Sequence, residues 1–394
     1  MAISDRPGPA AAARRPFGVY VHFPYCTFRC PYCDFAVSTD PVPQSRYTDG
    51  VLAELEARAA GFAGLECRSL YLGGGTPSLW DPDQVARVVA LARGRLGLLP
   101  GAEVTLEANP ESAEAGRLRA FRDAGVSRFS IGVQSFDPAV LAKLGRRHRP
   151  EAAERAIRAA AGVVQNVAAD LIYGARRSSA GTARRDAERL AALPVVHVSA
   201  YALTLDRELL AEEVPLSRLL GQGRIALPPE DETLAQGRAI RAALRRAGLR
   251  RYEISNFARP GFESVHNRLY WDSESYLGVG VGAFGCLHRA GEALRWGNHR
   301  APGPWLAAVE AGRLPSAEEE RLGPAELRRE RVMLALRTAR GLPEEEIAPG
   351  RRGEVGPLLA RRLAVRRGGR LVLTSRGMDL HSAVVERLVE WEAS

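Results

Sequence analysis

The sequence predicts an α/β protein whose main part is a partial (β/α)6 barrel. Two observations predict this fold class. Short runs rich in β-branched and aromatic residues alternate with amphipathic helical stretches over the first 205 residues, which amounts to about six β/α units. Glycines and polar residues recur where these runs end, and in barrels of parallel strands the strand ends carry the functional residues.

The β-rich runs are predicted as strands and the stretches between them as helices. The predicted strands are residues 17–22, 69–72, 103–108, 128–134, 168–173 and 196–203. The predicted helices are residues 46–60, 82–92, 113–124, 152–161 and 183–193. We therefore assign residues 17–205 to the barrel, preceded by residues 1–16, an Ala-, Pro- and Arg-rich leader that we expect to be disordered.

The second half of the chain predicts two further parts. Residues 206–322 read as an elaboration of the barrel: irregular to residue 229, helical over 231–247, a strand over 251–257, then a Gly-, aromatic- and His-rich segment to about residue 304. Residues 323–394 read as helices at 325–338 and 355–362, a strand pair at 363–366 and 370–374, and a last helix at 378–390. This order resembles a small winged-helix-like module.

Composition places the chain among ordinary globular proteins. Hydrophobic residues make up 46% and charged residues 26%. No apolar run approaches the length of a membrane span, and the alanines at residues 10–13 are too few for the apolar core of a signal peptide. We expect a cytoplasmic protein, with a peripheral place at the inner membrane face left open.

The net charge of +9 at pH 7 raises the question of a nucleic-acid partner. Only Lys143 among the 55 basic residues is a lysine, and the arginines are spread along helix-like segments such as residues 184–189 and 238–251. This spread indicates solvated faces more than a phosphate-binding track, so we do not expect nucleic acid. Arginine also suits carboxylates, such as the propionates of a porphyrin.

Three cysteines, Cys26, Cys30 and Cys33, lie within eight residues with the spacing C-x3-C-x2-C. Three thiolates this close can ligate three corners of a cubic iron–sulfur cluster, which four cysteines normally hold. Cys67 and Cys286 are far away in the sequence and read as small buried residues. A cluster with three protein ligands leaves one iron open, and an open metal site is a place for chemistry.

Two other uses of these cysteines stay open at this point. A structural zinc site would need a fourth ligand, and His22, four residues before Cys26, could supply it. A disulfide framework is the weaker alternative, since five cysteines in a long chain without a secretion signal indicate a reducing compartment.

Further polar residues and glycines mark the ends of the following strands. Three glycines, Gly73 to Gly75, follow the second predicted strand, where a missing side chain lets the backbone approach a ligand. Glu107 ends the third strand, Gln134 ends the fourth, and Asp170 lies in the fifth. Together these residues can form a ring around one mouth of the barrel.

These residues carry a resemblance to a known family. Residues 20–26 (Tyr-Val-His-Phe-Pro-Tyr-Cys), the cysteine loop with Tyr32, and residues 73–77 look like the radical S-adenosylmethionine (SAM) superfamily. The stretches 107–110 (Glu-Ala-Asn-Pro), 131–134 (Ile-Gly-Val-Gln) and 170–174 (Asp-Leu-Ile-Tyr-Gly) narrow this to the oxygen-independent coproporphyrinogen III oxidase-like family. The resemblance covers roughly residues 17–390.

The resemblance implies a [4Fe–4S] cluster on the three cysteines, with SAM on the fourth iron. Electron transfer from such a cluster cleaves SAM to a 5′-deoxyadenosyl radical, and the protein supplies binding and shielding. By position in the motifs, the residues expected to line the SAM pocket are Tyr20, Tyr32, Gly74, Gly75 and Thr76. Those expected to contact SAM or a second ligand are Glu107, Gln134, Arg146 and Asp170.

Two features favour the HemW-type heme chaperone branch of this family. The porphyrinogen-oxidising branch carries a further cysteine two residues after the third, and here that position is Phe35. Residues 266–271 match the H-N-x-x-Y-W motif of the chaperone branch, and residues 252–258 just before them resemble it too. The motif residues that we assign to heme are His266, Asn267, Tyr270 and Trp271.

His266 admits two interpretations. An imidazole beside large aromatic rings can ligate heme iron, or it can be a hydrogen-bonded structural histidine among core aromatics. Two departures from the family pattern also stand out: residues 175–182 replace the usual Leu-Pro-Gly-Gln-Thr run, and Phe284-Gly285 stands where His-Ser is usual. They put in doubt the backbone near the fifth strand and any role of that second His.

We therefore expect a heme chaperone that binds the cluster, SAM and heme and passes heme to apo-cytochromes of respiratory enzymes. The resemblance implies a possible homodimer, and an electron donor such as flavodoxin or ferredoxin if SAM is cleaved; whether it is cleaved productively, and hence whether the protein is an enzyme, stays open. The first alternative is anaerobic oxidative decarboxylation of coproporphyrinogen III, a step of porphyrin biosynthesis. The second is a radical SAM enzyme that modifies RNA, which predicts steeply salt-dependent RNA binding.

Overall fold

The structure, a computed structural model, describes residues 14–205 and 214–389. Six parallel strands form the first part of one large sheet, in the order in which they occur in the chain. They are β1 (Pro16–Phe23), β2 (Glu66–Gly74), β3 (Glu103–Ala108), β4 (Arg128–Gln134), β5 (Asn166–Tyr173) and β6 (His197–Ala202). The predicted α/β class with a partial barrel of six β/α units is confirmed.

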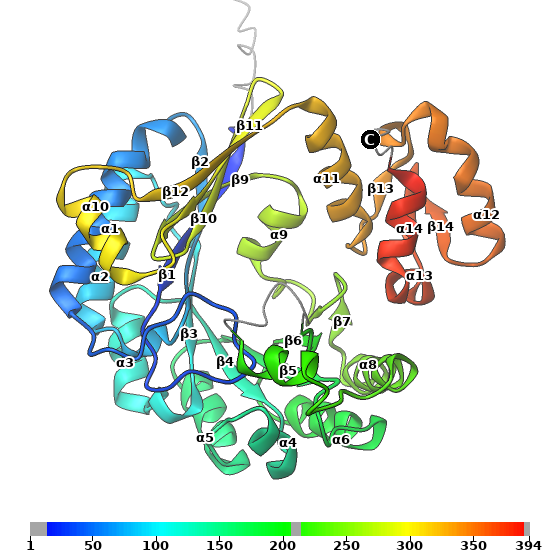
Figure 1. Ribbon diagram of the computed structural model, residues 1–394, viewed down its shortest axis with the longest axis horizontal. Helices are drawn as coiled ribbons and strands as arrows, with labels where there is room; N and C mark the ends of the chain where they lie inside the picture. Colours follow the sequence, from blue (N-terminus) through cyan, green and yellow to red (C-terminus); the bar gives the residue numbers. More distant parts are fainter. Residues whose placement is uncertain (1–13, 206–213, 390–394) are drawn as a thin grey trace, which may run out of the picture.

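Helices cover the outer, convex face of this sheet (Figure 1). They are α1 (Gln44–Ala59), α2 (Pro82–Arg95), α3 (Ala115–Asp123), α4 (Pro138–Lys143), α5 (Pro150–Ala161) and α6 (Ala180–Ala191). Single-turn 3₁₀ helices at Ala60–Phe62, Pro77–Leu79 and Pro110–Ser112 join some of them to the strands. Each predicted helix of the barrel is present, with bounds that differ by a few residues.

The first strand shows why the two faces of the sheet differ. Val19 and Val21 point outward into the core that also contains Leu55 of α1. Between them, Tyr20 and His22 point to the inner face, where the tyrosine hydroxyl lies 3.0 Å from Nδ1 of the histidine. Successive side chains of a strand alternate between faces, so this sequence packs helices on one side and lines a polar interior on the other.

The middle segment extends the same sheet on both edges, which the sequence did not predict. Residues 251–257, expected as one strand, instead contribute to the hairpin of β7 (Arg250–Arg251) and β8 (Asn256–Ala258), and β8 pairs with β6. Beyond β1 the sheet continues with β9 (Ser275–Gly280), parallel to β1, and then with antiparallel strands β10 (Phe284–Arg289), β11 (Glu292–Asn298) and β12 (Ser316–Leu322). The sheet therefore has 12 strands over the described residues.

The helices of this middle segment are α7 (Pro215–Gly221), α8 (Glu230–Arg246), α9 (Val265–Trp271) and α10 (Pro302–Glu310). Helix α8 confirms the helix predicted over 231–247, while α7 falls in the stretch expected to be irregular. The rest of that stretch, residues 206–213, lies outside the described residues, as does nearly all of the predicted leader. Helix α9 lies on the inner side of the sheet, against β1, β2 and β9 (Figure 1).

The C-terminal residues form a smaller unit with its own hydrophobic core, which includes Leu336, Leu358 and Leu371. Its elements are α11 (Pro324–Leu336), β13 (Leu342–Pro343), α12 (Val355–Ala360), β14 (Ala364–Arg367), β15 (Arg370–Leu373), α13 (Ser375–Asp379) and α14 (His381–Leu388), with 3₁₀ turns at Glu344–Glu346 and Pro349–Glu354. The last helix, expected as continuous from residue 378, is broken at Leu380 into α13 and α14. None of the described helices is long and apolar enough to cross a bilayer.

Candidate active site at the carboxyl ends of the strands

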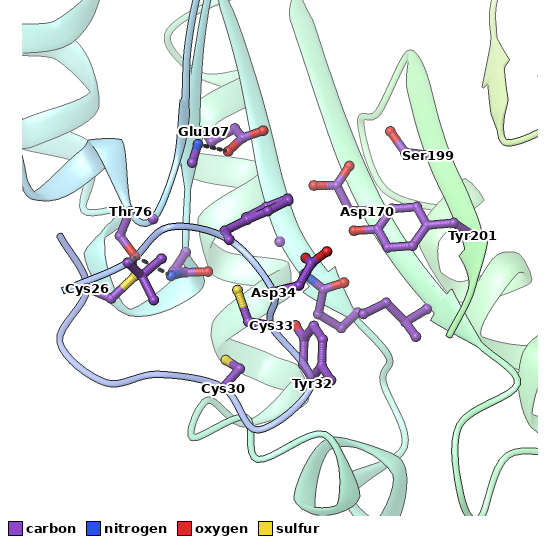
Figure 2. Close-up of a pocket in the computed structure, with 18 of the residues that line it drawn as sticks. Cys26, Cys30, Tyr32, Cys33, Asp34, Thr76, Glu107, Asp170, Ser199 and Tyr201 are labelled. Carbon is purple, nitrogen blue, oxygen red and sulfur yellow. Dashed lines mark hydrogen bonds between the residues drawn. The ribbon is translucent and has the colours of Figure 1, made fainter. Parts of the chain in front are cut away.

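A cavity of about 590 Å³ opens at the carboxyl ends of the parallel strands. The cysteine loop between β1 and α1 forms one wall (Figure 2). Residues from β2 to β6, β8 and α9 form the rest. Parallel barrels place their functional residues at this end because every strand brings its last side chains to the same mouth.

Cys26, Cys30 and Cys33 all line this cavity, and all three are free thiols. Two backbone hydrogen bonds close the loop that carries them: Cys26 N donates to the carbonyl of Ser38 at 2.9 Å, and Ser38 N donates to that of Pro24 at 2.8 Å. Within the loop, Cys33 N donates to the carbonyl of Cys30 at 3.1 Å. The C-x3-C-x2-C spacing thus places all three cysteines in one closed loop along the wall of the cavity.

A chain of side-chain hydrogen bonds connects the first two cysteines. The Thr76 hydroxyl donates to Cys26 Sγ at 3.4 Å and accepts from Asn109 Nδ2 at 2.9 Å. Asn109 Oδ1 accepts from Arg146 at 2.6 Å, and Arg146 Nη1 lies 3.6 Å from Cys30 Sγ. Donors aimed at sulfur stabilise thiolates, so this network suits cysteines that act as metal ligands.

Burial raises the pKa of the Cys33 thiol to about 11 and also raises that of Cys26. A bound metal would release these protons, because thiolates are the ligating form. The alternative of a single zinc ion closed by His22 does not fit. Nε2 of His22 donates to the Ala36 carbonyl at 2.9 Å and Nδ1 lies 3.0 Å from the Tyr20 hydroxyl, so both ring nitrogens already have partners.

Two half-buried carboxylates, Glu107 and Asp170, face the cavity from β3 and β5 (Figure 2). Glu107 accepts hydrogen bonds from the Tyr71 hydroxyl at 2.7 Å and from Gly74 N at 3.1 Å. Burial raises the pKa of Glu107 to about 7 and raises the pKa of Asp170 as well. Carboxylates held in this way can accept hydrogen bonds from hydroxyls or stabilise a cation in the cavity.

Gln134 ends β4 in a left-handed backbone conformation, with φ of 66°, at a register shift in the pairing with β5. Its side chain lines the cavity, and its buried Oε1 has no hydrogen-bond partner among the described residues. A strained backbone and an unsatisfied buried oxygen are features of ligand sites, where the ligand supplies the missing partner. Together with the three thiols, they show that the residues present fit a cluster with a bound polar cofactor.

The structure brings together most of the residues predicted to line the SAM pocket. Those that line the cavity are Tyr32, Gly74, Gly75, Thr76, Glu107, Gln134, Arg146 and Asp170. Gly75 lets the β2 loop reach the cysteine loop, since a Cβ there would lie 2.8 Å from the Tyr25 carbonyl oxygen. Tyr20 is the exception: it packs beside Tyr71 and does not line the cavity.

Sequence reasoning missed several lining residues: Tyr71, Asn109, Ser199, Tyr201 and Asn256. Asn109 belongs to the Glu-Ala-Asn-Pro stretch, so its motif could have identified it. The signal for Tyr71 and Ser199 was weaker, because only the alternation along β2 and β6 turns their side chains inward.

The residues of the predicted heme motif lie in two places, the cavity wall and the protein interior. Asn267 lines the cavity, whereas His266 is 1% exposed and both of its ring nitrogens are occupied: Nδ1 lies 2.9 Å from Ser69 Oγ and Nε2 lies 2.9 Å from the Tyr270 hydroxyl. Trp271 packs under the guanidinium of Arg337, 4.4 Å from the ring centre. The two hydrogen bonds of its ring favour the structural interpretation of His266 over that of an iron ligand.

The two departures from the family pattern lie where regular elements begin. Residues 175–182 lead into α6, where the Ser179 hydroxyl accepts from Thr182 N at 3.2 Å and the Thr182 hydroxyl accepts from Ser179 N at 2.6 Å, a capping box. Phe284 begins β10, and its side chain is 44% exposed. Phe35, in the cysteine loop, is 53% exposed and lines the cavity.

The chain is similar to proteins of known families. Residues 20–190 match the family model described as the radical SAM superfamily. A Mycobacterium tuberculosis (strain H37Rv) protein named heme chaperone HemW is 38% identical over 390 residues, which cover 98% of this chain and 98% of that protein. The heme chaperone HemW of Escherichia coli (strain K12) is 36% identical over 276 residues, 68% of this chain and 70% of that protein.

A mouse relative, named radical S-adenosyl methionine domain-containing protein 1, mitochondrial, is 36% identical over 354 residues, 87% of this chain and 78% of that protein. Among solved structures, coproporphyrinogen III oxidase (HemN) from Escherichia coli, described as a radical SAM enzyme, superposes with a TM-score of 0.78. That match covers 95% of this chain and 90% of the other at 21% identity, so it shows a shared fold.

Proposed function

The chain belongs to the radical SAM superfamily and, within it, to the family of the HemW heme chaperones, and from this premise we propose that it binds heme and transfers it to apo-hemoproteins. The premise rests on similarity over 98% of the chain, which includes the cavity and the C-terminal unit together. The proposal extends the function of those relatives to this protein through the residues of its own site.

Cys26, Cys30 and Cys33 would hold a [4Fe–4S] cluster whose fourth iron is left for SAM, and such a group supplies one electron to the ligand beside it. Arg146 and Thr76 would stabilise the sulfur atoms that they already contact. The carboxylates of Glu107 and Asp170 would face the sulfonium and the ribose hydroxyls of SAM, and the unpartnered Gln134 Oε1 would accept a further donor.

Phe35 is the observation that favours the chaperone function over porphyrinogen oxidation. The oxidising branch has a cysteine at this position, and here the cavity wall ends in an exposed aromatic ring. The ring lies edge-on to His22, with 6.5 Å between ring centres, and lines the cavity. An exposed phenyl ring is a surface on which a planar macrocycle can pack.

Phe284 and Tyr201 offer further exposed aromatic surface near the same end of the sheet. Phe284 starts β10 directly after the turn that follows β9, and β9 pairs with β1 up to His22. Arg29 lines the cavity wall beside the cysteines. Aromatic faces with a guanidinium at the rim match the two parts of heme, its flat ring and its propionates.

The test is transfer of heme by anaerobically reconstituted protein. The full chain should bind heme in about a one-to-one ratio and lose it to an apo-cytochrome that acquires its own absorption spectrum. A protein that takes up no heme, or retains it in the presence of the acceptor, would contradict the proposal. Formation of protoporphyrinogen from coproporphyrinogen III under the same conditions would establish the oxidase in its place.

The partners follow from the same proposal. The acceptors would be apo-cytochromes of respiratory enzymes, which would bring the protein to the inner membrane face and could involve a homodimer. If SAM is cleaved, a flavodoxin or ferredoxin would reduce the cluster. Heme transfer should be measured with and without SAM and reductant. Transfer that requires both would indicate a cluster that takes part in turnover, and transfer that requires neither would indicate a structural cluster.

A further inference from the structure

Helix α9, which carries the H-N-x-x-Y-W motif, is fixed inside the barrel by contacts from three strands. Its first turn is held by Glu103 of β3, whose carboxylate accepts from Val265 N at 3.2 Å, from His266 N at 3.1 Å and from the Ser264 hydroxyl at 3.2 Å. Arg128 of β4 lies 3.9 Å from the same carboxylate. Glu103, Ser264 and His266 are buried, so water competes little with the hydrogen bonds between them.

His266 completes this attachment on the other side of the helix. Its ring bridges Ser69 of β2 and Tyr270 of α9 through its two nitrogens, each at 2.9 Å. Gly18 of β1 leaves the room for it, because a Cβ at that position would lie 2.9 Å from the His266 ring. The Tyr71 ring lies 5.0 Å from it, between the histidine and Glu107.

The attachment of α9 determines where the next residue, Asn267, lies in the cavity. Ser69 and Gly18 lie in the first halves of β2 and β1, whereas the cysteine loop follows the end of β1, so α9 closes the cavity from the side opposite the cysteines. Asn267 lines the cavity from this helix, and its side-chain amide makes no hydrogen bond to any other residue that the structure describes.

The wall around Asn267 has a distinct chemistry. Asn256 lies in the same wall with a buried Oδ1 that has no partner among the described residues, and Ser199 and Asp170 complete it. The arginines that line the cavity, Arg29 and Arg146, belong to the cysteine side. Amides, a hydroxyl and a carboxylate match the hydroxyls and ring nitrogens of a nucleoside, and they offer no cation to a propionate.

We infer that the H-N-x-x-Y-W segment forms one side of the SAM-binding cavity. His266 is a positioning residue that fixes α9 against β1 and β2. Asn267 contacts the bound ligand, at the nucleoside end of SAM. The inference rests on the proposed cluster and SAM site. On this inference, the iron of a bound heme is ligated by a residue other than His266.

The experiment compares His266→Gln, His266→Ala and Asn267→Ala in the full chain, with Arg268→Ala as the matched control, since Arg268 is an exposed residue of the same helix. Three quantities are measured: the thermal unfolding midpoint, SAM affinity by equilibrium dialysis of the anaerobically reconstituted protein, and the absorption spectrum of the ferric heme complex.

Asn267→Ala should leave the unfolding midpoint unchanged and weaken SAM binding roughly fivefold to tenfold, the loss of one hydrogen bond. His266→Ala should lower the midpoint, and His266→Gln should restore part of it, with the heme absorption bands unchanged in both variants. The control should change none of the three quantities.

Unchanged SAM affinity in Asn267→Ala would overturn the contact assigned to that residue. Heme bands that shift in His266→Gln while the unfolding midpoint stays constant would overturn the positioning role and make His266 the iron ligand. If the wild-type protein binds neither SAM nor heme, the proposed function fails, whereas the unfolding midpoints still decide whether His266 anchors α9.

Discussion

The buried, neutral state of His266 predicts a defined loss of stability at acid pH. Its ring is enclosed by Ser69 and Tyr71 of β2, Tyr20 of β1 and Tyr270 of its own helix, and burial lowers its pKa to about 3. The charged groups nearest to it are Arg128 and Glu103, which pair with each other. In the unfolded chain the same histidine has a pKa of about 6.5.

The direction and the size of the pH effect on stability follow from this difference between the folded and the unfolded pKa of His266. Below about pH 6.5, His266 binds a proton in the unfolded chain but stays neutral in the folded protein. The free energy of unfolding therefore falls as the pH is lowered toward 3. Between pH 7 and pH 5 this loss amounts to about 2 kcal/mol for His266 alone. His22, with a pKa lowered to about 4, and His197, with a lowered pKa, add losses of the same sign.

The assay is denaturant unfolding of the cluster-free chain at both pH values for the wild type and His266→Gln. Groups with raised pKa values, such as Glu107 and Asp186, oppose the histidines but are present in both proteins, so they cancel in the comparison. Acidification should cost the variant about 2 kcal/mol less than the wild type, while Arg268→Ala should behave like the wild type. Equal losses in the wild type and His266→Gln would refute the burial of a neutral imidazole at this position.

Three further predictions concern the cavity. Cys33→Ser should lose the iron content and the visible absorption of the reconstituted cluster, whereas Cys67→Ser, which replaces a buried thiol of the core, should keep both; retention in the first variant would exclude Cys33 as a ligand. Wild-type affinity for SAM should rise up to about tenfold as the pH passes upward through 7, since Glu107 becomes charged there, and Glu107→Gln should show no such rise in equilibrium dialysis. Phe35→Ala should weaken heme binding by about tenfold in spectroscopic titration, with Phe284→Ala showing a similar effect; heme affinity unchanged in both would remove the aromatic surface from the proposal.

The sequence predicted those parts of the protein that depend on local pattern. The six parallel strands could be identified because apolar runs such as residues 17–22 and 128–134 are short, β-rich and bounded by helical stretches. The three cysteines could be identified for a similar reason, since Cys26, Cys30 and Cys33 lie within eight residues of one another. Residues at strand ends, such as Glu107, followed from the topology of parallel strands alone.

The tertiary structure decided what depends on pairing between distant segments. Strands β9 to β11 arise from a glycine-rich stretch with weak local preference, and β9 becomes a strand because β1 offers it an unpaired edge more than 250 residues earlier in the chain. The same holds for His266. Its sequence neighbours suggest an iron ligand, but Gly18, Ser69 and Glu103, all distant in sequence, enclose it and turn Asn267 toward the cavity instead. A motif determines which side chains are present, whereas the packing of remote strands determines which of them remain free to bind.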